Sequence, residues 1–189
     1  MSPTVIIIIA VVVLLAIWFI STMNGLIKSK TTVDEAFSGM DINLQKRYDL
    51  IPNLVNTVKG YAAHEKETLE NVIAARNSAV SADHSDINAV AEAEKNLQGA
   101  VGRLLAIAEA YPDLKADSQF LNLQNQLQSI ENDIAQSRKY YSGAAKLYNQ
   151  KIMMFPSSIV AALTGHKKVS YFEVSDASQR ENVTVDFSK

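Results

Sequence analysis

The chain contains no cysteine. That absence excludes disulfides, thiolate zinc sites, cysteine nucleophiles and a lipid-modified cysteine of the lipoprotein type. Glycine and proline are scarce, with 7 and 4 copies in 189 residues, while Ala, Leu, Gln, Glu and Lys recur, a balance that favours helices over a sheet. The net charge of −2 gives no basic face for nucleic acid, so we expect no nucleic-acid partner.

Sequence motifs for catalysis and nucleotide binding are missing as well. No serine lies in a Gly-x-Ser-x-Gly motif, and no glycines form a phosphate-binding loop. His64, His84 and His166 do not form the helical pair of a zinc-protease motif, so we expect structural or solvated roles for them. The sequence therefore predicts a protein that is not an enzyme, with no cofactor, no metal and no small-molecule substrate.

One long apolar run dominates the start of the chain. Residues 5–23 read VIIIIAVVVLLAIWFISTM, and no charged side chain precedes Lys28. In a helix this run is about 29 Å long, close to the roughly 30 Å hydrocarbon core of a bilayer. Trp18 and Phe19 lie toward its far end, where aromatic rings favour the lipid–water interface. The run predicts a transmembrane anchor in the lipid bilayer, with residues 1–4 as a short flank.

A cleaved signal peptide is the alternative interpretation of this run. Such a peptide has a basic start and a small-x-small cleavage site, whereas residues 1–4 carry no basic side chain and residues 20–24 fit that site poorly. We therefore expect an uncleaved single-pass anchor in the cell (inner) membrane. Because Lys28 and Lys30 follow the run, the positive-inside rule predicts that Met1 lies outside and that the rest of the chain is cytoplasmic.

Four stretches with helical periodicity follow the anchor. In the first, apolar residues recur in steps of three and four from Val33 to Val58, which predicts a helix. This helix either begins after a linker of residues 24–32, with Thr31 or Thr32 as its cap, or continues from the anchor without a break. Three more helices are expected over about 69–80, 87–110 and 118–155, with Ser85 or Asp86, and Asp117 or Ser118, as caps.

Residues 33–172 are therefore expected to form an all-α domain. Four long helices joined by short loops predict an antiparallel up-and-down four-helix bundle. Two short apolar patches, residues 158–163 and 171–172, are expected to dock on this bundle. Residues 173–189 are polar and are predicted to form a frayed or extended tail.

A proline lies inside the first predicted helix of this domain. Pro52 in a helix interior costs about 3 kcal/mol through a lost hydrogen bond and a clash. Tyr48, Ile51 and later apolar residues nevertheless keep the helical phase across it. We therefore predict a kink or local break, with the carbonyl near Tyr48 bonded to a side chain or water. Arg47 and Asp49 are expected to set the register against other helices.

The domain also carries an ordered set of short motifs. They are Gln45-Lys-Arg-Tyr-Asp-Leu-Ile-Pro-Asn-Leu-Val55, Val58-Lys-Gly-Tyr61, Ala75-Arg76, Glu109-Ala-Tyr-Pro-Asp-Leu-Lys115, Arg138-Lys-Tyr-Tyr141, Tyr148-Asn149, Phe155-Pro156 and Tyr171-Phe172-Glu173. Their order resembles the LemA family of bacterial membrane-anchored proteins over most of residues 33–173. The sequence departs from the family where Tyr141-Ser142 replaces the usual Tyr-Asn. The resemblance implies a short outside segment, one span and a cytoplasmic helical bundle, and it brings no enzymatic activity.

The motif residues supply the candidates for structural or interaction roles, which are Arg47, Asp49, Pro52, Arg76, Glu109, Tyr111, Pro112, Arg138, Tyr141 and Asn149. The charged candidates, together with Glu131, lie on or near apolar stripes, so several are expected to point between helices. One interpretation is a carboxylate–guanidinium site for a ligand or for proton transfer. The favoured interpretation is interhelical ion pairs that fix register, in which losing one partner of a buried pair costs about 3–5 kcal/mol.

These features favour a membrane-tethered interaction protein over an enzyme. The leading hypothesis is a scaffold of the LemA type that forms homo-oligomers or organises membrane-protein partners at the cytoplasmic membrane. An accessory or regulatory subunit of a membrane protease or envelope-stress system is the alternative.

Overall fold

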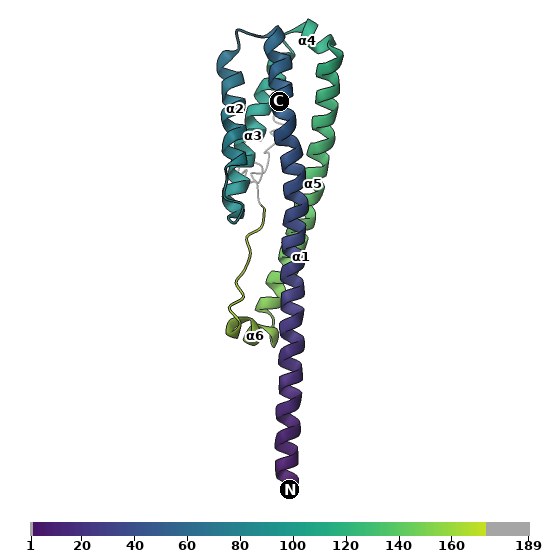
Figure 1. The fold of residues 1–189 in the computed structure, drawn as a ribbon, viewed down its shortest axis with the longest axis vertical. Coiled ribbons are helices and arrows are strands. Elements are labelled where there is room, and N and C mark those ends of the chain that lie inside the picture. Colours follow the sequence, from purple (N-terminus) through teal and green to yellow (C-terminus); the bar gives the residue numbers. More distant parts are fainter. Residues whose placement is uncertain (1, 173–189) are drawn as a thin grey trace, which may run out of the picture.

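The computed structural model describes residues 2–172, and every regular element in that range is a helix. The six helices are α1 (Pro3–Tyr61), α2 (Lys66–Val80), α3 (Ile87–Ala108), α4 (Pro112–Ala116), α5 (Ser118–Met153) and α6 (Ser157–Leu163) (Figure 1). The predicted all-α fold is confirmed. The polar tail predicted for residues 173–189 lies outside the described residues.

Helix α1 is continuous for 59 residues, which corresponds to a length of about 88 Å. Its N-terminal apolar part projects alone beyond the other helices (Figure 1). The helix runs through residues 24–32 without a break, so the structure has no linker there. Thr31 and Thr32 are not caps, because their hydroxyls donate to the carbonyls of Ile27 and Lys28 inside the helix.

The C-terminal part of α1 forms the centre of an antiparallel bundle with α2, α3 and α5 (Figure 1). Its closest partner is α5, and α2 and α3 form a hairpin that packs against it through α2. One face of α1 enters the core through side chains that are no more than 2% exposed, including Val33, Met40, Leu44, Ile51 and Val58. The stripes that predicted the helices are thus the faces that meet in the core.

Aspartates cap two of the helices as the sequence predicted. The Asp86 carboxylate accepts from the Asn88 amide of α3 at 2.9 Å, and Asp117 accepts from the Phe120 amide of α5 at 2.8 Å. Helix α4 was not expected. Pro112 opens it, where a missing N–H has no cost, and Leu114 anchors it in the core with no exposed surface.

The chain after α5 turns back along the bundle. Helix α6 packs against α1 near the end of the apolar run, where Val160 and Ala161 meet Leu26 in a small separate core. Residues 165–172 then leave α6 and run back toward the α2–α3 hairpin (Figure 1). We call this segment the strap. The expected docking of residues 158–163 and 171–172 holds for α6 and for Phe172, which is buried, whereas the Tyr171 side chain is exposed.

Candidate functional site

Four charged side chains from three helices meet inside the bundle. Arg47 of α1 and Glu94 of α3 are fully buried, and Glu131 and Arg138 come from α5. We call these four residues the charged cluster. The Arg47 guanidinium forms an ion pair with Glu94 and donates from Nη1 to Glu131 Oε1 at 2.8 Å. Arg138 Nη2 lies 3.6 Å from Glu94 Oε2. Two positive and two negative groups thus neutralise one another between three helices.

A tyrosine extends this network. The Tyr48 hydroxyl donates to Glu94 Oε1 at 2.6 Å. Burial, together with the neighbouring Glu94 carboxylate, raises the pKa of Tyr48 well above its ordinary value, so the hydroxyl keeps its proton. Both carboxylate oxygens of Glu94 therefore have donors, which a buried carboxylate requires.

The two arginines respond differently to burial. Burial lowers the pKa of Arg47, but the attraction of Glu94 and Glu131 outweighs this effect and leaves the pKa raised. For Arg138 burial prevails and the pKa is lowered, with Glu94 opposing the shift. The Arg138 guanidinium also lies over the Phe172 ring, 4.8 Å from its centroid, and so links the cluster to the strap. Arg47 is therefore the electrostatic centre of the cluster, and Arg138 connects the cluster to the strap.

The carbonyl freed by Pro52 has a side-chain partner. A proline at position 52 cannot donate to the Tyr48 carbonyl four residues earlier. Arg76 of α2 donates to that oxygen from Nε at 3.2 Å. Helix α1 continues on both sides of Pro52. The hydrogen bond from Arg76 therefore connects α2 to α1 at the carbonyl that the proline leaves free. The side chain expected at this carbonyl is Arg76, and the kink itself stays a prediction.

Two further sequence candidates hold the strap. The Asn149 side chain donates to the Val169 carbonyl at 2.9 Å and accepts from the Val169 amide at 3.0 Å. The Tyr141 hydroxyl donates to the Ser170 carbonyl at 2.8 Å. Because Asn149 and Tyr141 are both buried, these hydrogen bonds hold the strap against α5 in a partly buried setting.

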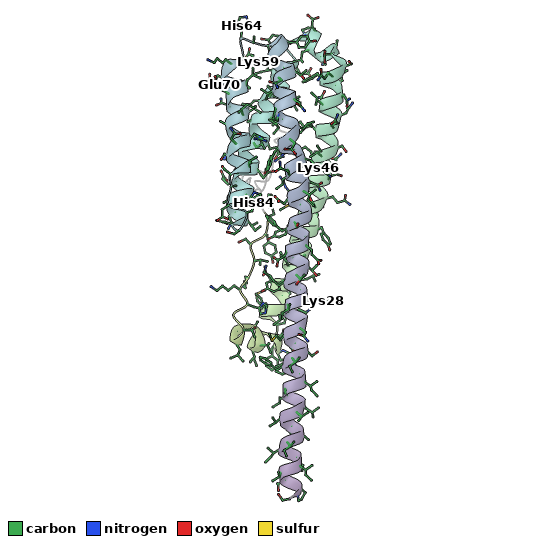
Figure 2. The ribbon with its side chains drawn as sticks, viewed as in Figure 1. Lys28, Lys46, Lys59, His64, Glu70 and His84 are labelled. Carbon is green, nitrogen blue, oxygen red and sulfur yellow. The ribbon has the colours of Figure 1, made fainter. Side chains whose placement is uncertain are left out.

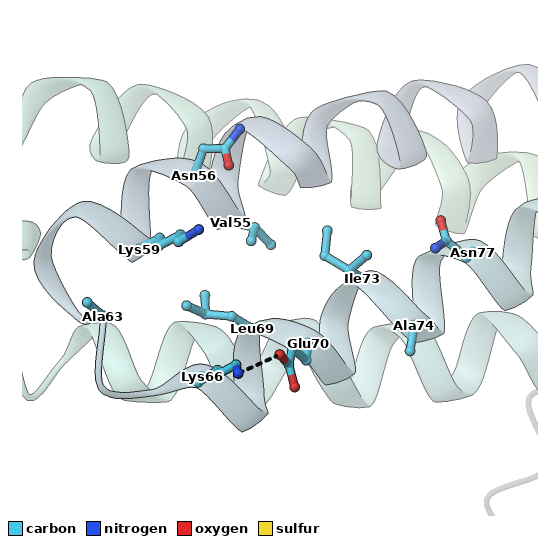
Figure 3. Close-up of a pocket in the computed structure, with 10 residues that line it drawn as sticks. All are labelled: Val55, Asn56, Lys59, Ala63, Lys66, Leu69, Glu70, Ile73, Ala74 and Asn77. Atoms are coloured by element: carbon cyan, nitrogen blue, oxygen red, sulfur yellow. Dashed lines mark ion pairs between the residues drawn. The ribbon is translucent and has the colours of Figure 1, made fainter.

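A groove opens between α1 and α2 at the end of the bundle far from the apolar run. Its volume is about 570 Å³. Val55, Leu69 and Ile73 form apolar walls, while the Lys66–Glu70 pair, 3.6 Å apart, lies at the rim (Figure 3). Small side chains at Ala63 and Ala74 leave the space that larger ones would fill, an effect that the sequence pattern did not predict.

The LemA family profile matches residues 36–187, which include the charged cluster, the strap and the groove. The chain belongs to the LemA family. Curated relatives extend this likeness into the apolar part of α1, because they cover about nine-tenths of the chain.

Three relatives illustrate the range of the similarity. The magnetosome protein MamQ of Magnetospirillum gryphiswaldense is 25% identical over 203 residues, covering 93% of this chain and 75% of MamQ. Magnetosome protein MamQ 2 of Paramagnetospirillum magneticum is 25% identical over 200 residues, covering 91% of this chain and 74% of its own length. Protein LemA of Metamycoplasma hominis is 26% identical over 171 residues, covering 90% of this chain and 76% of its own length.

Two charged candidates do not take part in the cluster of this LemA family member. Asp49 is exposed and accepts from the Gln45 side chain one turn earlier at 2.8 Å, so it sets no register between helices. Glu109 is also exposed and pairs with Lys115 in the turn around α4. Proximity to an apolar stripe was not enough, because Asp49 lies on the outer side of α1 and Glu109 lies in the turn that follows α3.

The remaining candidates shape the turn between α3 and α5. The Tyr111 hydroxyl donates to Glu65 Oε1 at 3.3 Å, and Pro112 is the first residue of α4. Together they join the α3–α4 connection to the start of α2. Both residues lie at the end of the bundle that carries the groove.

Sequence reasoning missed Glu94, although a signal was present. Glu94 replaces an apolar residue in the stripe of α3, where the buried neighbours in steps of three and four are Val90, Leu97, Val101 and Leu104. Arg47, Glu131 and Arg138 interrupt the stripes of α1 and α5 in the same way. A charge at the centre of a stripe predicts a buried partner on another helix, since an unpaired charge there is too costly.

Among the described residues, no group of three or more His, Asp or Glu side chains could hold a metal ion. His84 lies 3.0 Å from Asp41 of α1, and its ring packs edge-on against Phe37. His166 shares a hydrogen bond of 3.0 Å with the Tyr148 hydroxyl. These two histidines have structural partners on neighbouring elements, as expected from the sequence.

Proposed function

We propose that this LemA family member is a membrane-anchored scaffold without enzymatic activity. It spans the cell (inner) membrane through residues 5–23, with Met1 outside and the bundle in the cytoplasm. At that membrane it assembles with copies of itself or organises other membrane proteins. Support comes first from α1, the one helix among the described residues that is long and apolar enough to cross a membrane.

The observation that carries the proposal is the continuity of α1 from the apolar run to the groove. From Met23 to Val55 the helix extends about 48 Å without interruption. The bundle is therefore not a domain on a flexible tether. A groove of about 570 Å³ is held at a fixed distance from the end of the span, which suits a scaffold that presents a binding surface.

The charged cluster supports a structural role for the interior polar groups. Arg47 faces two carboxylates, and Glu94 faces two guanidinium groups and a tyrosine hydroxyl. Groups that neutralise one another between three helices fix the register of those helices.

Orientation can be tested with a C-terminal reporter that is active only in the cytoplasm. Lys28 and Lys30 follow the apolar run, so the reporter is expected to be active. A silent reporter on a full-length, membrane-inserted chain would reverse the assigned orientation.

Cross-linking in intact membranes tests the scaffold itself. Because the chain has no cysteine, a single introduced cysteine is a unique attachment point for a photoreactive maleimide. Ala74→Cys places the probe in the groove, and Ala135→Cys places a matched probe at an exposed position of α5. Mass spectrometry of the adducts is expected to identify a second copy or a defined membrane protein from position 74 and not from position 135.

Each outcome of this experiment has a clear meaning. Adducts with a membrane protease would select the alternative role as an accessory or regulatory subunit. Equal labelling from both positions would show that the groove is not the contact surface. A complete lack of defined adducts, with the variants correctly inserted, would contradict the scaffold proposal.

A further inference from the structure

The corner between α5 and α6 exposes a patch of large apolar side chains. We call this patch the foot; it consists of Met153, Met154, Phe155, Ile159 and Leu163. Phe155, in the turn between the two helices, is 81% exposed, and Leu163, the last residue of α6, is 73% exposed. Five large apolar side chains exposed within eleven consecutive residues of a folded protein indicate a surface that contacts another apolar phase or molecule.

The position of the foot along α1 identifies that phase. The inner face of α6 packs through Val160 and Ala161 against Leu26, and Trp18 and Phe19 lie against the same small core. Trp18 and Phe19 belong to the apolar span, so α6 sits at the level at which α1 leaves the hydrocarbon. Figure 2 shows Lys28, the first charged residue of the chain, at this same level of the molecule.

The stretches of sequence that form the span, the end of α5 and α6 are rich in basic residues. Residues 1–33 and 134–172 contain no Asp or Glu, and their basic residues are Lys28, Lys30, Arg138, Lys139, Lys146, Lys151, Lys167 and Lys168. Although the whole chain has a net charge of −2, these two segments are therefore positive, and Asp34, the first carboxylate of α1, pairs with Lys30 just beyond the first of them. Anionic lipid headgroups attract such a juxtamembrane basic segment.

Lys151, just before the foot, connects α5 to α1. Its ammonium donates to the Gly25 carbonyl at 3.0 Å and to the Ser29 hydroxyl at 2.7 Å. It thus ties the end of α5 to α1 two residues before Met153. Lys167 and Lys168 are exposed on the strap just after α6. Exposed apolar side chains with lysines close by in the chain are typical of an element that lies in the membrane interface.

We propose that the foot is a second membrane contact, which inserts into the interface of the leaflet on the bundle side while the surrounding lysines bind anionic phospholipid headgroups. This inference rests on the proposed anchoring through residues 5–23. It makes the protein a two-point membrane binder, in which α1 crosses the bilayer and α6 lies at its surface. The foot fixes both the depth of α1 and the rotation of the bundle about α1.

Depth-dependent quenching in vesicles tests the foot on the full chain. Leu163→Cys and Leu121→Cys place the same environment-sensitive fluorophore at two exposed leucines, one in the foot and one near the opposite end of the bundle. The vesicles contain phosphatidylcholine alone or phosphatidylcholine with phosphatidylglycerol, each with a headgroup-level spin-labelled lipid. The probe at position 163 is expected to be blue-shifted and quenched several-fold more than the probe at position 121, and more strongly with phosphatidylglycerol.

A charge variant and an extraction assay separate the foot from the anchor. Phe155→Asp is expected to reduce quenching at position 163 several-fold, while the chain still resists alkaline extraction through α1. If the chain resists extraction but both probes report an aqueous environment, the proposed membrane contact of the foot is wrong and the proposed anchor is retained. If alkaline treatment releases the unsubstituted chain, both are overturned. A blue shift at position 163 without lipid quenching, together with disulfide formation between two unlabelled copies of the Leu163→Cys variant, would identify a protein interface and overturn the lipid contact.

Discussion

The two ends of α1 share one backbone but occupy two different environments. Residues 5–17 are apolar on every face and all exposed, whereas from Leu26 onward one face is buried against other helices. An apolar stripe indicates a partner helix, and an apolar surface all round indicates a membrane or a core. In the proposed anchoring, lipid surrounds one end of this helix, while α5, α2 and α3 pack against the other.

Charge separates these two ends most clearly. The N-terminal end has no ionisable side chain before Lys28, while the C-terminal end buries Arg47 completely. The buried arginine is tolerated because Glu94 and Glu131 reach it from other helices. The comparison predicts that the bundle is sensitive to the removal of a charge and that the span is sensitive to the introduction of one.

Removal of Glu94 should have the largest effect. Glu94→Ala leaves Arg47 and Arg138 with a single carboxylate, and we expect a loss of about 3–5 kcal/mol in the free energy of unfolding. Chemical denaturation of the chain in detergent, followed by circular dichroism, measures it. Glu92→Ala removes an exposed glutamate of the same helix and should change stability by no more than about 0.5 kcal/mol. Similar losses from both variants would contradict the central role of the cluster.

A double variant sharpens the same point. Arg47→Met combined with Glu94→Leu replaces the buried pair by apolar side chains of similar length. We expect this variant to recover much of the stability that Glu94→Ala loses, because both members of the buried pair are replaced and neither is left as an unpaired charge. Equal instability of the two would mean that lost packing, and not the lost charge balance, explains the first result.

The introduction of a charge into the span is the converse test. Val13→Lys places a cation near the middle of the apolar run, at a cost to insertion of about 2.5–3.5 kcal/mol. The fraction of protein that resists alkaline extraction should fall, while thermal unfolding of the bundle in detergent stays unchanged. Val13→Leu is the matched control. A lowered melting temperature of the bundle would show that the two ends of α1 are energetically coupled.

A smaller effect is expected where α2 meets the proline. Arg76→Ala removes the donor to the Tyr48 carbonyl and should cost about 1 kcal/mol. In a Pro52→Ala background, the restored amide can bond to this carbonyl, so the same change should cost less. A double-mutant cycle on the free energy of unfolding measures the coupling. Independent effects of the two changes would show that Arg76 acts elsewhere. Arg103→Ala, at an exposed position, is the control.

The smallest predicted effect concerns alkaline pH. The pKa of Tyr48 is raised by burial and by Glu94, so the folded chain keeps a proton that the unfolded chain releases above about pH 10. Its contribution to stability is present below that pH and is lost as the pH rises further. Tyr48→Phe should make stability fall less steeply between neutral and alkaline pH. An unchanged slope would mean that the other tyrosines account for the whole dependence.

Local sequence patterns predicted much of the fold. The stripes placed α2, α3 and α5 to within a few residues, and Asp86 and Asp117 are the caps that the sequence offered. Of the two alternatives for residues 24–32, the linker was wrong and the continuous helix was right. The linker was suggested by the weak helix propensity of Asn24 and Gly25, but α1 continues through both residues. Lys151 and α6 contact α1 at this point, and such tertiary contacts override propensity.

The site was less predictable because its members come from different helices. Arg47, Arg138, Tyr141 and Asn149 were selected from motifs, but the partners Glu94 and Val169 lie far away in sequence. The groove depends on the separation of two helices, which periodicity does not specify. For Asp49 the sequence predicted an interhelical contact that the structure does not have. Asp49 is next to the apolar stripe of α1 in sequence, but its side chain is exposed to water.

The uninterrupted α1 also works as a lever. Transmembrane helices tilt by about 20° on average, and more in thinner bilayers. A rigid helix with that tilt displaces a point about 48 Å beyond the span sideways by about 16 Å. If α1 crosses the bilayer as proposed, its tilt sets the position of Val55 and of the groove beside it. Bilayer thickness would then change the distance from the membrane at which the bundle can contact a partner.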